Sequence, residues 1–332
     1  RTLDGDLYAF GMNHLYQLGI VTTETVVIPV KVAWDTDIAK VVSARFLSVL
    51  LDDYGKLAVA GMSRQFCSLE GIPLMQDITA GRSSWFALDI HGCCWEWNGR
   101  KLQLMENLSS VIQITGGRDE RINIVAVDEK RNIIISSANG TRVTLELEEI
   151  ADGPVLALAV NRNTLALVDS SNDLWIIRCG SPNATTSVEK IKVPKMRDVV
   201  AGSSCFIALD ENGCVWCLGA LGDYLYYALP PYKGLRVHFQ HFTKLLAFGE
   251  NNIAVAAGKD YYMVTDEKNK LKVMGDNQVG QLGIRSLLQK LASLVGLEQH
   301  DRVVLNPVKH SLTSQPPHKP RNITKPAKSA AK

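Results

Sequence analysis

The sequence lacks the marks of a membrane protein, of most enzymes and of a strongly basic nucleic-acid-binding domain. Its 332 residues carry a net charge of only +2, so the body of the chain gives no argument for non-specific binding to nucleic acid. No run of about 18 apolar residues occurs, so we expect no transmembrane helix. Phosphate-binding glycine loops, the Gly-x-Ser-x-Gly motif and the His-Glu-x-x-His motif are missing. We therefore expect neither an enzyme nor a cofactor, although exchange-factor activity stays open.

Cysteine is present, but without the pattern of a disulfide framework or a metal site. Seven is an odd number, and most of these residues stand beside strand-like apolar residues. This favours free, buried thiols in a reducing compartment, the cytoplasm or the nucleus. Cys214 and Cys217 have Cys-x-x-Cys spacing, but residues three apart on a strand point to opposite faces. Since zinc would need a second pair, we expect structural cysteines and no metal.

What the chain does contain is a repeat. Residues 7–20 and 271–284 are identical at seven of fourteen positions without a gap, and the tripeptide Pro-Val-Lys follows each copy. Both copies hold a Gly, an Asn and the sequence Gln-Leu-Gly. A unit that recurs near both ends of a chain predicts a repeat architecture.

Between these two copies, a polar turn followed by a short apolar strand recurs along the chain. Asp or Asn with Gly is the chemistry of tight turns between strands. A second pair of apolar strands precedes most copies, which makes four short strands about every 40 to 50 residues, and this period predicts a β-propeller. The seven copies begin at Asp4, Asp53, Asp89, Asp128, Asn172, Asp210 and Asp266.

These units resemble the RCC1-type (regulator of chromosome condensation) repeat. That repeat combines an apolar strand with Gly, a small apolar strand such as Phe-Ala-Leu, an Asp-x-x-Gly turn, and Gly-x-Asn followed by Gly-Gln-Leu-Gly. The two end copies and the copy at 201–219 carry the pattern best, whereas the copies between 109 and 180 have lost most glycines. The resemblance covers roughly residues 1 to 310 and implies an all-β, seven-bladed RCC1-like propeller, in agreement with the seven copies.

The first blade is incomplete in the sequence, because seven turn–strand copies have only six upstream strand pairs. The first copy begins at Asp4 with nothing before it. Either residues upstream of Arg1 complete this blade, or the C-terminal segment does. An open ring would leave strand edges unpaired. We therefore expect residues 1–310 to form one ring whose first and last repeats are neighbours.

Two insertions interrupt the repeat. Residues 286–297 hold leucines at helical spacing, which predicts a short helical insertion near the C-terminus. Residues 220–241 are rich in tyrosine, and Tyr with Arg is typical of the residues that dominate binding interfaces. An equally open alternative is that these rings cover the blade beneath them. The candidate partner-binding residues are Tyr224, Tyr226, Tyr227, Tyr232, Arg236 and Phe239.

The last segment, residues 311–332, has five basic residues, four prolines and no acid. This composition predicts a basic tail that is disordered in isolation. Nucleic acid is a possible partner only here, where cationic side chains could contact phosphates. The alternatives are a solubilising end or a nuclear-import signal. The candidate tail contacts are Lys319, Arg321, Lys325 and Lys328.

Because fold alone does not determine function, the expected function is a general one. We expect a non-enzymatic protein-interaction scaffold or adaptor, whose partner is a small GTPase or a multi-subunit complex. The resemblance implies two alternatives. One is a guanine-nucleotide exchange factor, possibly associated with chromatin. The other is a partner protein of the type associated with Elongator and diphthamide synthesis.

Overall fold

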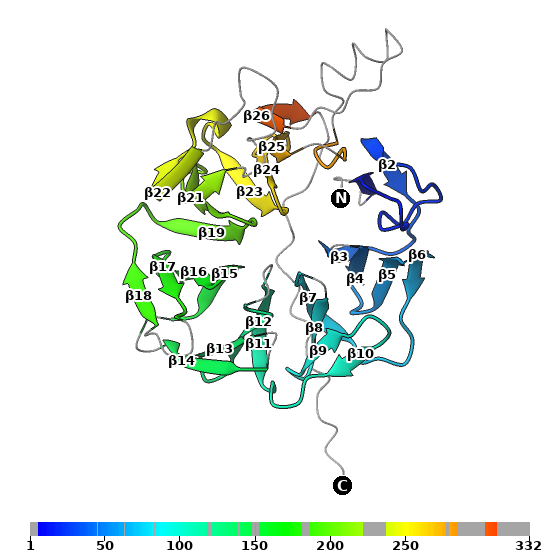
Figure 1. The fold of residues 1–332 in the computed structure, drawn as a ribbon, viewed down its shortest axis with the longest axis horizontal. Helices are drawn as coiled ribbons and strands as arrows, with labels where there is room; N and C mark the ends of the chain where they lie inside the picture. Colours follow the sequence, from blue (N-terminus) through cyan, green and yellow to red (C-terminus); the bar gives the residue numbers. More distant parts are fainter. Residues whose placement is uncertain are drawn as a thin grey trace.

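The chain folds into β-sheets arranged around a ring, with strands as the main elements (Figure 1). The structure is a computed structural model that describes residues 6–44, 46–62, 64–82, 84–117, 121–137, 140–147, 150, 153–180, 186–221, 237–276, 279–283 and 303–310. Short apolar strands cannot bury their side chains alone, and stacking one sheet on the next supplies the missing cover. The predicted all-β propeller is confirmed.

Six of the sheets in the described residues are four-stranded antiparallel blades. Their strands are β3 (Ile38–Ser43), β4 (Leu47–Asp52), β5 (Leu57–Gly61) and β6 (Arg64–Ser68); β7 (Met75–Ala80), β8 (Trp85–Asp89), β9 (Cys94–Trp97) and β10 (Leu102–Leu104); β11 (Val111–Gly116), β12 (Ile124–Asp128), β13 (Asn132–Ser136) and β14 (Arg142–Glu146). The second half of the ring holds β15 (Val155–Asn161), β16 (Thr164–Asp169), β17 (Leu174–Arg178) and β18 (Ser187–Lys190); β19 (Met196–Ala201), β20 (Cys205–Asp210), β21 (Val215–Leu221) and β22 (Val237–Lys244); β23 (Asn252–Ala257), β24 (Tyr261–Asp266), β25 (Leu271–Asp276) and β26 (Val303–His310).

The seventh sheet has only two strands, β1 (Leu7–Gly11) and β2 (Val26–Val32). The prediction of seven blades was therefore wrong, because the described residues form six blades and one hairpin. The physical reason is that a turn–strand copy marks one strand of a unit and not a complete blade. Each turn–strand copy marks the third strand of a unit, and β1 is such a strand. In the described residues the first unit holds only its third and fourth strands, β1 and β2.

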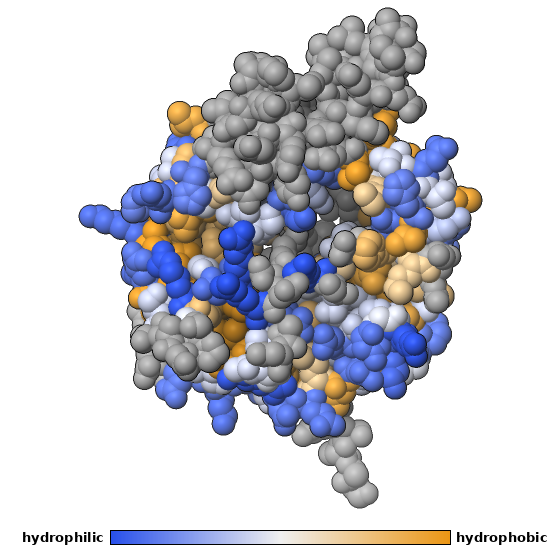
Figure 2. All heavy atoms as spheres, viewed as in Figure 1, coloured by the Kyte–Doolittle hydropathy of each residue, from blue (hydrophilic) through white to orange (hydrophobic). Residues whose placement is uncertain are grey.

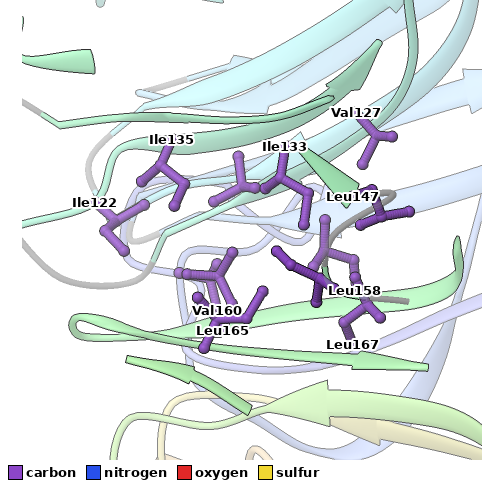
Figure 3. Packing of buried hydrophobic residues seen from close by; sticks show 12 residues of the cluster. Ile122, Val127, Ile133, Ile135, Leu147, Leu158, Val160, Leu165 and Leu167 are labelled. Carbon is purple, nitrogen blue, oxygen red and sulfur yellow. The ribbon is translucent and has the colours of Figure 1, made fainter. Parts of the chain in front are cut away.

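The hydrophobic core lies between neighbouring blades. In five of the six blades the second strand is almost wholly buried, as in β4, β8 and β20, whereas β24 alternates between buried and partly buried residues. Figure 3 shows the contact between the blade of β11–β14 and the blade of β15–β18, where Ile133 and Ile135 face Leu165 and Leu167. All four side chains are buried. Because each blade covers its neighbours in this way, the ring has a chain of inter-blade cores.

The ring has two faces that differ in the loops they carry. We call one the motif face, because it holds the connections between the third and fourth strands, including residues 12–25 and 279–283 with the Gln-Leu-Gly copies. The other is the turn face, which holds the Asp turns between second and third strands and the connections between blades. This assignment follows from the antiparallel pairing of successive strands.

The first and last units are neighbours, as Figure 1 shows for the hairpin at β2 and the blade of β23–β26. A Cβ on Gly280 would lie 2.9 Å from the carbonyl oxygen of Val26, and one on Gly11 would lie 3.7 Å from the Cα of Gln281. Residues 279–283 thus close the ring by packing on the hairpin. The predicted helix at 286–297 and the tail lie outside the described residues, and the domain boundaries stay predictions.

The face in Figure 2 has a mixed surface, with hydrophobic residues over the part of the ring that Figure 1 labels β3–β5 and hydrophilic residues along much of the rim. A helix long and apolar enough to span a bilayer is not found within the described ranges.

Candidate protein-interaction surfaces

The turn face is built on a repeated aspartate that ends the second strand of each four-stranded blade. In Asp210, one carboxylate oxygen accepts the N–H groups of Asn212 and Cys214 at 2.9 and 2.8 Å. The other oxygen accepts the indole N–H of Trp216 at 2.9 Å. The equivalent residues are Asp52, Asp89, Asp128, Asp169 and Asp266, and each accepts at least one backbone N–H of its own turn. These aspartates therefore have structural roles.

The indole partner recurs six residues after the aspartate in three blades. Asp89 accepts from Trp95 at 2.9 Å, and Asp169 accepts from Trp175 at 2.8 Å. This Asp-x-x-x-x-x-Trp spacing is a signal that is visible in the sequence. It marks the turn face of three blades.

In the last blade a lysine replaces the tryptophan. Lys272 is buried, and its ammonium donates to the carbonyl of Phe248 at 2.7 Å and to the side-chain oxygen of Asn252 at 2.8 Å. The carboxylate of Asp266 lies 3.7 Å away. A buried cation is tolerated only when it is paired and hydrogen-bonded, and these three oxygens meet that need. Lys272 thus ties the last blade to the connection before it.

Four glycines mark the motif face at the same place in the repeat. Gly11, Gly61, Gly219 and Gly275 have φ between +104° and +122°, a region that residues with a Cβ rarely occupy. In three of them a Cβ would also collide with the preceding strand, for example 2.4 Å from the carbonyl of Asp260 at Gly275. Glycine at these positions therefore avoids backbone strain and, at three of them, a steric collision.

The Gln-Leu-Gly copies form the same loop twice. The side-chain oxygen of Gln17 accepts the N–H of Leu15, and that of Gln281 accepts the N–H of Val279, both at 2.9 Å. Asn13 is fully buried and accepts the N–H of Leu18 at 2.9 Å while it donates to the carbonyl of Thr22. The first loop then packs on the ring of Phe66 through Leu18 and Ile20.

Exposed apolar side chains gather on the motif face of the first two units. Met12 and Met62 directly follow Gly11 and Gly61, so they stand at equivalent positions, and they are 37% and 52% exposed. Phe46 is 45% exposed, and its backbone oxygen lies against Gly61.

Only one of the six predicted partner-binding residues is described. Phe239 lies on β22 opposite Gly219 and is half-buried. It packs against the cluster between the blades of β19–β22 and β23–β26, beside Val200 and Ala257. Its packing supports the alternative of a structural role for this residue. The remaining candidates, Tyr224, Tyr226, Tyr227, Tyr232 and Arg236, lie outside the described residues, as do the tail candidates Lys319, Arg321, Lys325 and Lys328, and both sets stay predictions.

The cysteines are free, and most are buried. Cys214 contacts the carboxylate of Glu250 at 3.6 Å, whereas Cys217 lies in the apolar cluster beside Cys205. Burial raises the pKa of Cys94 to about 12 and that of Cys179 to about 11. Thiols of this kind are poor nucleophiles and poor metal ligands at neutral pH. Groups of His, Cys, Asp and Glu that could hold a metal ion do not occur in the described part of the chain.

A polar pocket of about 720 Å³ opens on the turn face between the blades of β19–β22 and β23–β26. We call it the turn-face pocket. One wall is the turn at 210–214, and the other is formed by residues 250–253 and Glu267. Lys244 and Glu250 form an ion pair at 2.8 Å in it. Hydrogen bonding between them raises the pKa of Lys244 and lowers that of Glu250.

Arg197 is the distinctive residue of the turn-face pocket. It stands at the bulge of β19, where its guanidinium donates to the carbonyl of Asn252, and its Nε is buried without a hydrogen-bond partner in the structure. The bulge recurs in the first strand of every four-stranded blade, with Ala39, Gln76, Ile112, Leu156 and Ile253 at that place. Arginine therefore occupies this position in one blade of the six.

Comparison with known proteins supports the resemblance to RCC1. The family model "Regulator of chromosome condensation (RCC1) repeat" matches residues 4–51. No curated protein matches the sequence significantly. Yeast RCC1 (Prp20), solved bound to Kap60, is similar with a TM-score of 0.71 at 14% identity, over 93% of this chain and 84% of that one. Human WBSCR16 is similar with a TM-score of 0.67 at 14% identity, over 91% and 95% of the two chains.

A second solved structure of Prp20p, from Saccharomyces cerevisiae, has a TM-score of 0.64 at 16% identity, over 79% of this chain and 78% of that one. Prp20p has been described with its binding properties to Gsp1p and histones. At these identities the similarity establishes the fold alone. The RCC1-like character of the chain is thus confirmed through one matched repeat and the propeller architecture.

Proposed function

We propose that the protein is a non-enzymatic interaction scaffold or adaptor that binds a protein partner through its motif face. The observation that carries this proposal is the pair Met12 and Met62, exposed at equivalent positions of neighbouring units, with Phe46 also exposed and its backbone against Gly61. Methionine adapts its shape to a partner, and apolar side chains gathered on one surface are typical of interaction sites. The free thiols suit an adaptor of the cytoplasm or nucleus.

The tyrosine-rich insertion belongs to the same surface in this proposal. The chain leaves β21 and enters β22 at the motif face. Tyr226, Tyr227 and Arg236 would act as anchors there, and the methionines would form the adaptable part of the interface.

Charge introduced on the motif face tests the proposal. The double variant Met12→Lys and Met62→Lys should reduce partner recovery in affinity purification with mass spectrometry at least tenfold, because two lysines would be buried against an apolar partner. Its melting temperature should be nearly unchanged, since substitutions of exposed side chains usually alter stability by no more than about 0.5 kcal/mol.

The matched control is Tyr54→Lys, which places the same charge on an exposed side chain of the blade of β3–β6, on the opposite face. It should retain the partners of the unmodified protein. If the double variant keeps these partners, or if Tyr54→Lys loses them equally, the motif face is not the binding surface.

The competing function is guanine-nucleotide exchange, and it rests on the fold shared with Prp20p and on the binding of Prp20p to Gsp1p. Exchange would also use a loop of a propeller face. The two functions separate in a nucleotide-release assay on a panel of small GTPases. The adaptor proposal expects no acceleration, and a tenfold faster release from any of them would replace it with exchange.

A further inference from the structure

We propose that Asn98, followed by Gly99 in the connection between β9 and β10, is a site of spontaneous modification, at which the side-chain amide is lost and aspartate or isoaspartate remains. The connection lies on the motif face, where third and fourth strands are joined. The reaction takes place within the chain and uses only water, so it is independent of any partner. Three features of the structure support it: an open turn, an available backbone nitrogen and a polarised side-chain carbonyl.

The chemistry is an attack by the backbone nitrogen of Gly99 on Cγ of Asn98. A bond forms between these atoms and the bond from Cγ to Nδ2 breaks, which closes a succinimide ring. The Gly99 nitrogen gives its proton to solvent, and the leaving group takes a proton from solvent and departs as ammonia. A water molecule then opens the ring at either of its carbonyls, giving aspartate or isoaspartate. Because nucleophile and carbonyl belong to adjacent residues, the step has the advantage of proximity.

Among the Asn-Gly pairs of the chain, the structure favours one. Glycine leaves room for ring closure because it has no side chain and few backbone restrictions, so the sequence alone treats all pairs alike. The N–H of Gly213 donates to the carbonyl of Asp210, and that of Gly140 donates to the carbonyl of Ser137, both at 3.0 Å. The N–H of Gly99 makes no such bond within the described residues, so its nitrogen is available to attack. The pairs stand at residues 98–99, 139–140 and 212–213.

The turn around Gly99 is open. Asn98 and Gly99 are exposed, Gly99 has φ of +91°, and nothing lies within 4 Å of the place that a Cβ would take. By contrast, Gly213 is buried, and a Cβ on it would lie 2.4 Å from the backbone nitrogen of Asn252 in the next blade. Ring closure requires the backbone to rotate. The packed turn at Gly213 opposes this rotation, whereas the exposed tip at Gly99 permits it.

The side-chain carbonyl of Asn98 is polarised by its own turn. Its Oδ1 accepts the N–H groups of Arg100 and Lys101, both at 3.0 Å. Negative charge develops on this oxygen when the Gly99 nitrogen attacks, and N–H groups already aimed at a developing charge stabilise the transition state. The Nδ2 group, which leaves, makes no hydrogen bond within the described residues. The turn thus favours attack and leaves the departing group exposed to solvent.

The product differs from asparagine in charge and in geometry. The connection at 98–101 carries two cations and no acid, and the modification adds a carboxylate to it. Isoaspartate also lengthens the main chain by one carbon between paired strands, where Trp97 lies opposite Leu102. We expect the short outer strand β10 to pair less firmly as a result, while the buried strand β8 keeps its place in the core.

Ageing of the folded protein at pH 8, followed by peptide mapping with mass spectrometry, tests the proposal. Asn98 should be modified at least about tenfold faster than Asn139 and Asn212, and it should give isoaspartate as well as aspartate, because ring opening yields both. In the urea-unfolded chain the three sites should react at similar rates, since the turns that distinguish them are lost. Equal rates in the folded protein would overturn the proposal, as would aspartate without isoaspartate, the product of direct hydrolysis.

Hydrogen exchange on the aged protein tests the structural consequence. Exchange should become about tenfold faster in β10 and stay unchanged in β7 and β8. The matched control is Asn98→Ser, which keeps a side-chain oxygen for the turn but has no amide to lose. Ageing should leave its exchange unchanged. If β10 of the aged control loosens equally, or if β10 of the original sequence does not loosen, modification of Asn98 does not weaken this strand.

Discussion

At the scale of the residue, the glycines of the motif face distinguish two costs of adding a side chain. One is backbone strain at positive φ, and the other is collision of the Cβ with a neighbouring strand. Gly11 and Gly275 have similar backbone angles, with φ of +113° and +122°. A Cβ on Gly275 would lie 2.4 Å from the carbonyl oxygen of Asp260, whereas the nearest atom to one on Gly11 is the Cα of Gln281 at 3.7 Å. The difference arises because β24 precedes β25 in the last blade, whereas the described residues include no strand before β1. The same glycine therefore meets two different surroundings.

We expect Gly275→Ala to lower the free energy of unfolding by about 3 kcal/mol, from backbone strain together with the collision. Gly11→Ala should cost only about 1 kcal/mol, the scale of the backbone strain alone. Urea unfolding of both variants measures the two values. Equal losses would mean that the contact with Asp260 relaxes freely and that only the backbone angle matters.

At the scale of the element, the Asp turn of the last blade has a pH dependence with a defined sign. Burial tends to raise the pKa of Asp266, but the N–H groups of Lys270 and Lys268 and the charge of Lys272 outweigh it and lower the pKa. A carboxylate with a lowered folded-state pKa stabilises the fold above its unfolded pKa of about 3.9. That stabilisation is lost as pH falls toward the folded-state value.

Asp266→Asn should therefore reduce stability at pH 7, and its deficit relative to the unmodified chain should shrink as pH falls below about 4. Urea unfolding at several pH values from 7 to 3 follows the deficit. Glu24→Gln, at an exposed carboxylate, serves as the control and should give a small difference at every pH. A deficit for Asp266→Asn that stays constant down to pH 3 would contradict a lowered pKa.

At the scale of the whole molecule, the ring is closed by a small contact. Gly280 has φ of +72°, and a Cβ there would lie 2.9 Å from both the carbonyl oxygen of Val26 and the Cα of Val27. We expect Gly280→Val to open this contact. Hydrogen exchange should then become about tenfold faster in β1, β2 and the blade of β23–β26, and should stay unchanged in β11–β18, because neighbouring blades are held by their own cores.

Gly140→Val is the control, because Gly140 also has a positive φ, of +85°, but nothing lies within 4 Å of a Cβ there. It should leave exchange in β1 and β2 unchanged. Faster exchange spread evenly over all blades in Gly280→Val would show that the ring opens as one cooperative unit.

Much of the blade architecture is determined by the sequence alone, because its causes are local. The turn at Asp210 is made within seven residues by one carboxylate and the donors that follow it. Glycine at positions 11 and 275 indicates a positive φ, and this cause is also local, because it depends only on the backbone of that residue. Strand positions, turn positions and the recurrence of the unit could therefore be predicted in order along the chain.

Only the tertiary structure decided how many complete blades exist and where pockets form. The turns indicate seven units, but a complete blade also needs two strands ahead of the third strand, and among the described residues the hairpin of β1 and β2 does not have them. The turn-face pocket brings Arg197 to Asn252 and Glu267 across two blades. Likewise, Met12 and Met62 are surface residues because of how neighbouring units stack. These features depend on contacts between residues about 50 positions apart, which no local pattern in the sequence encodes.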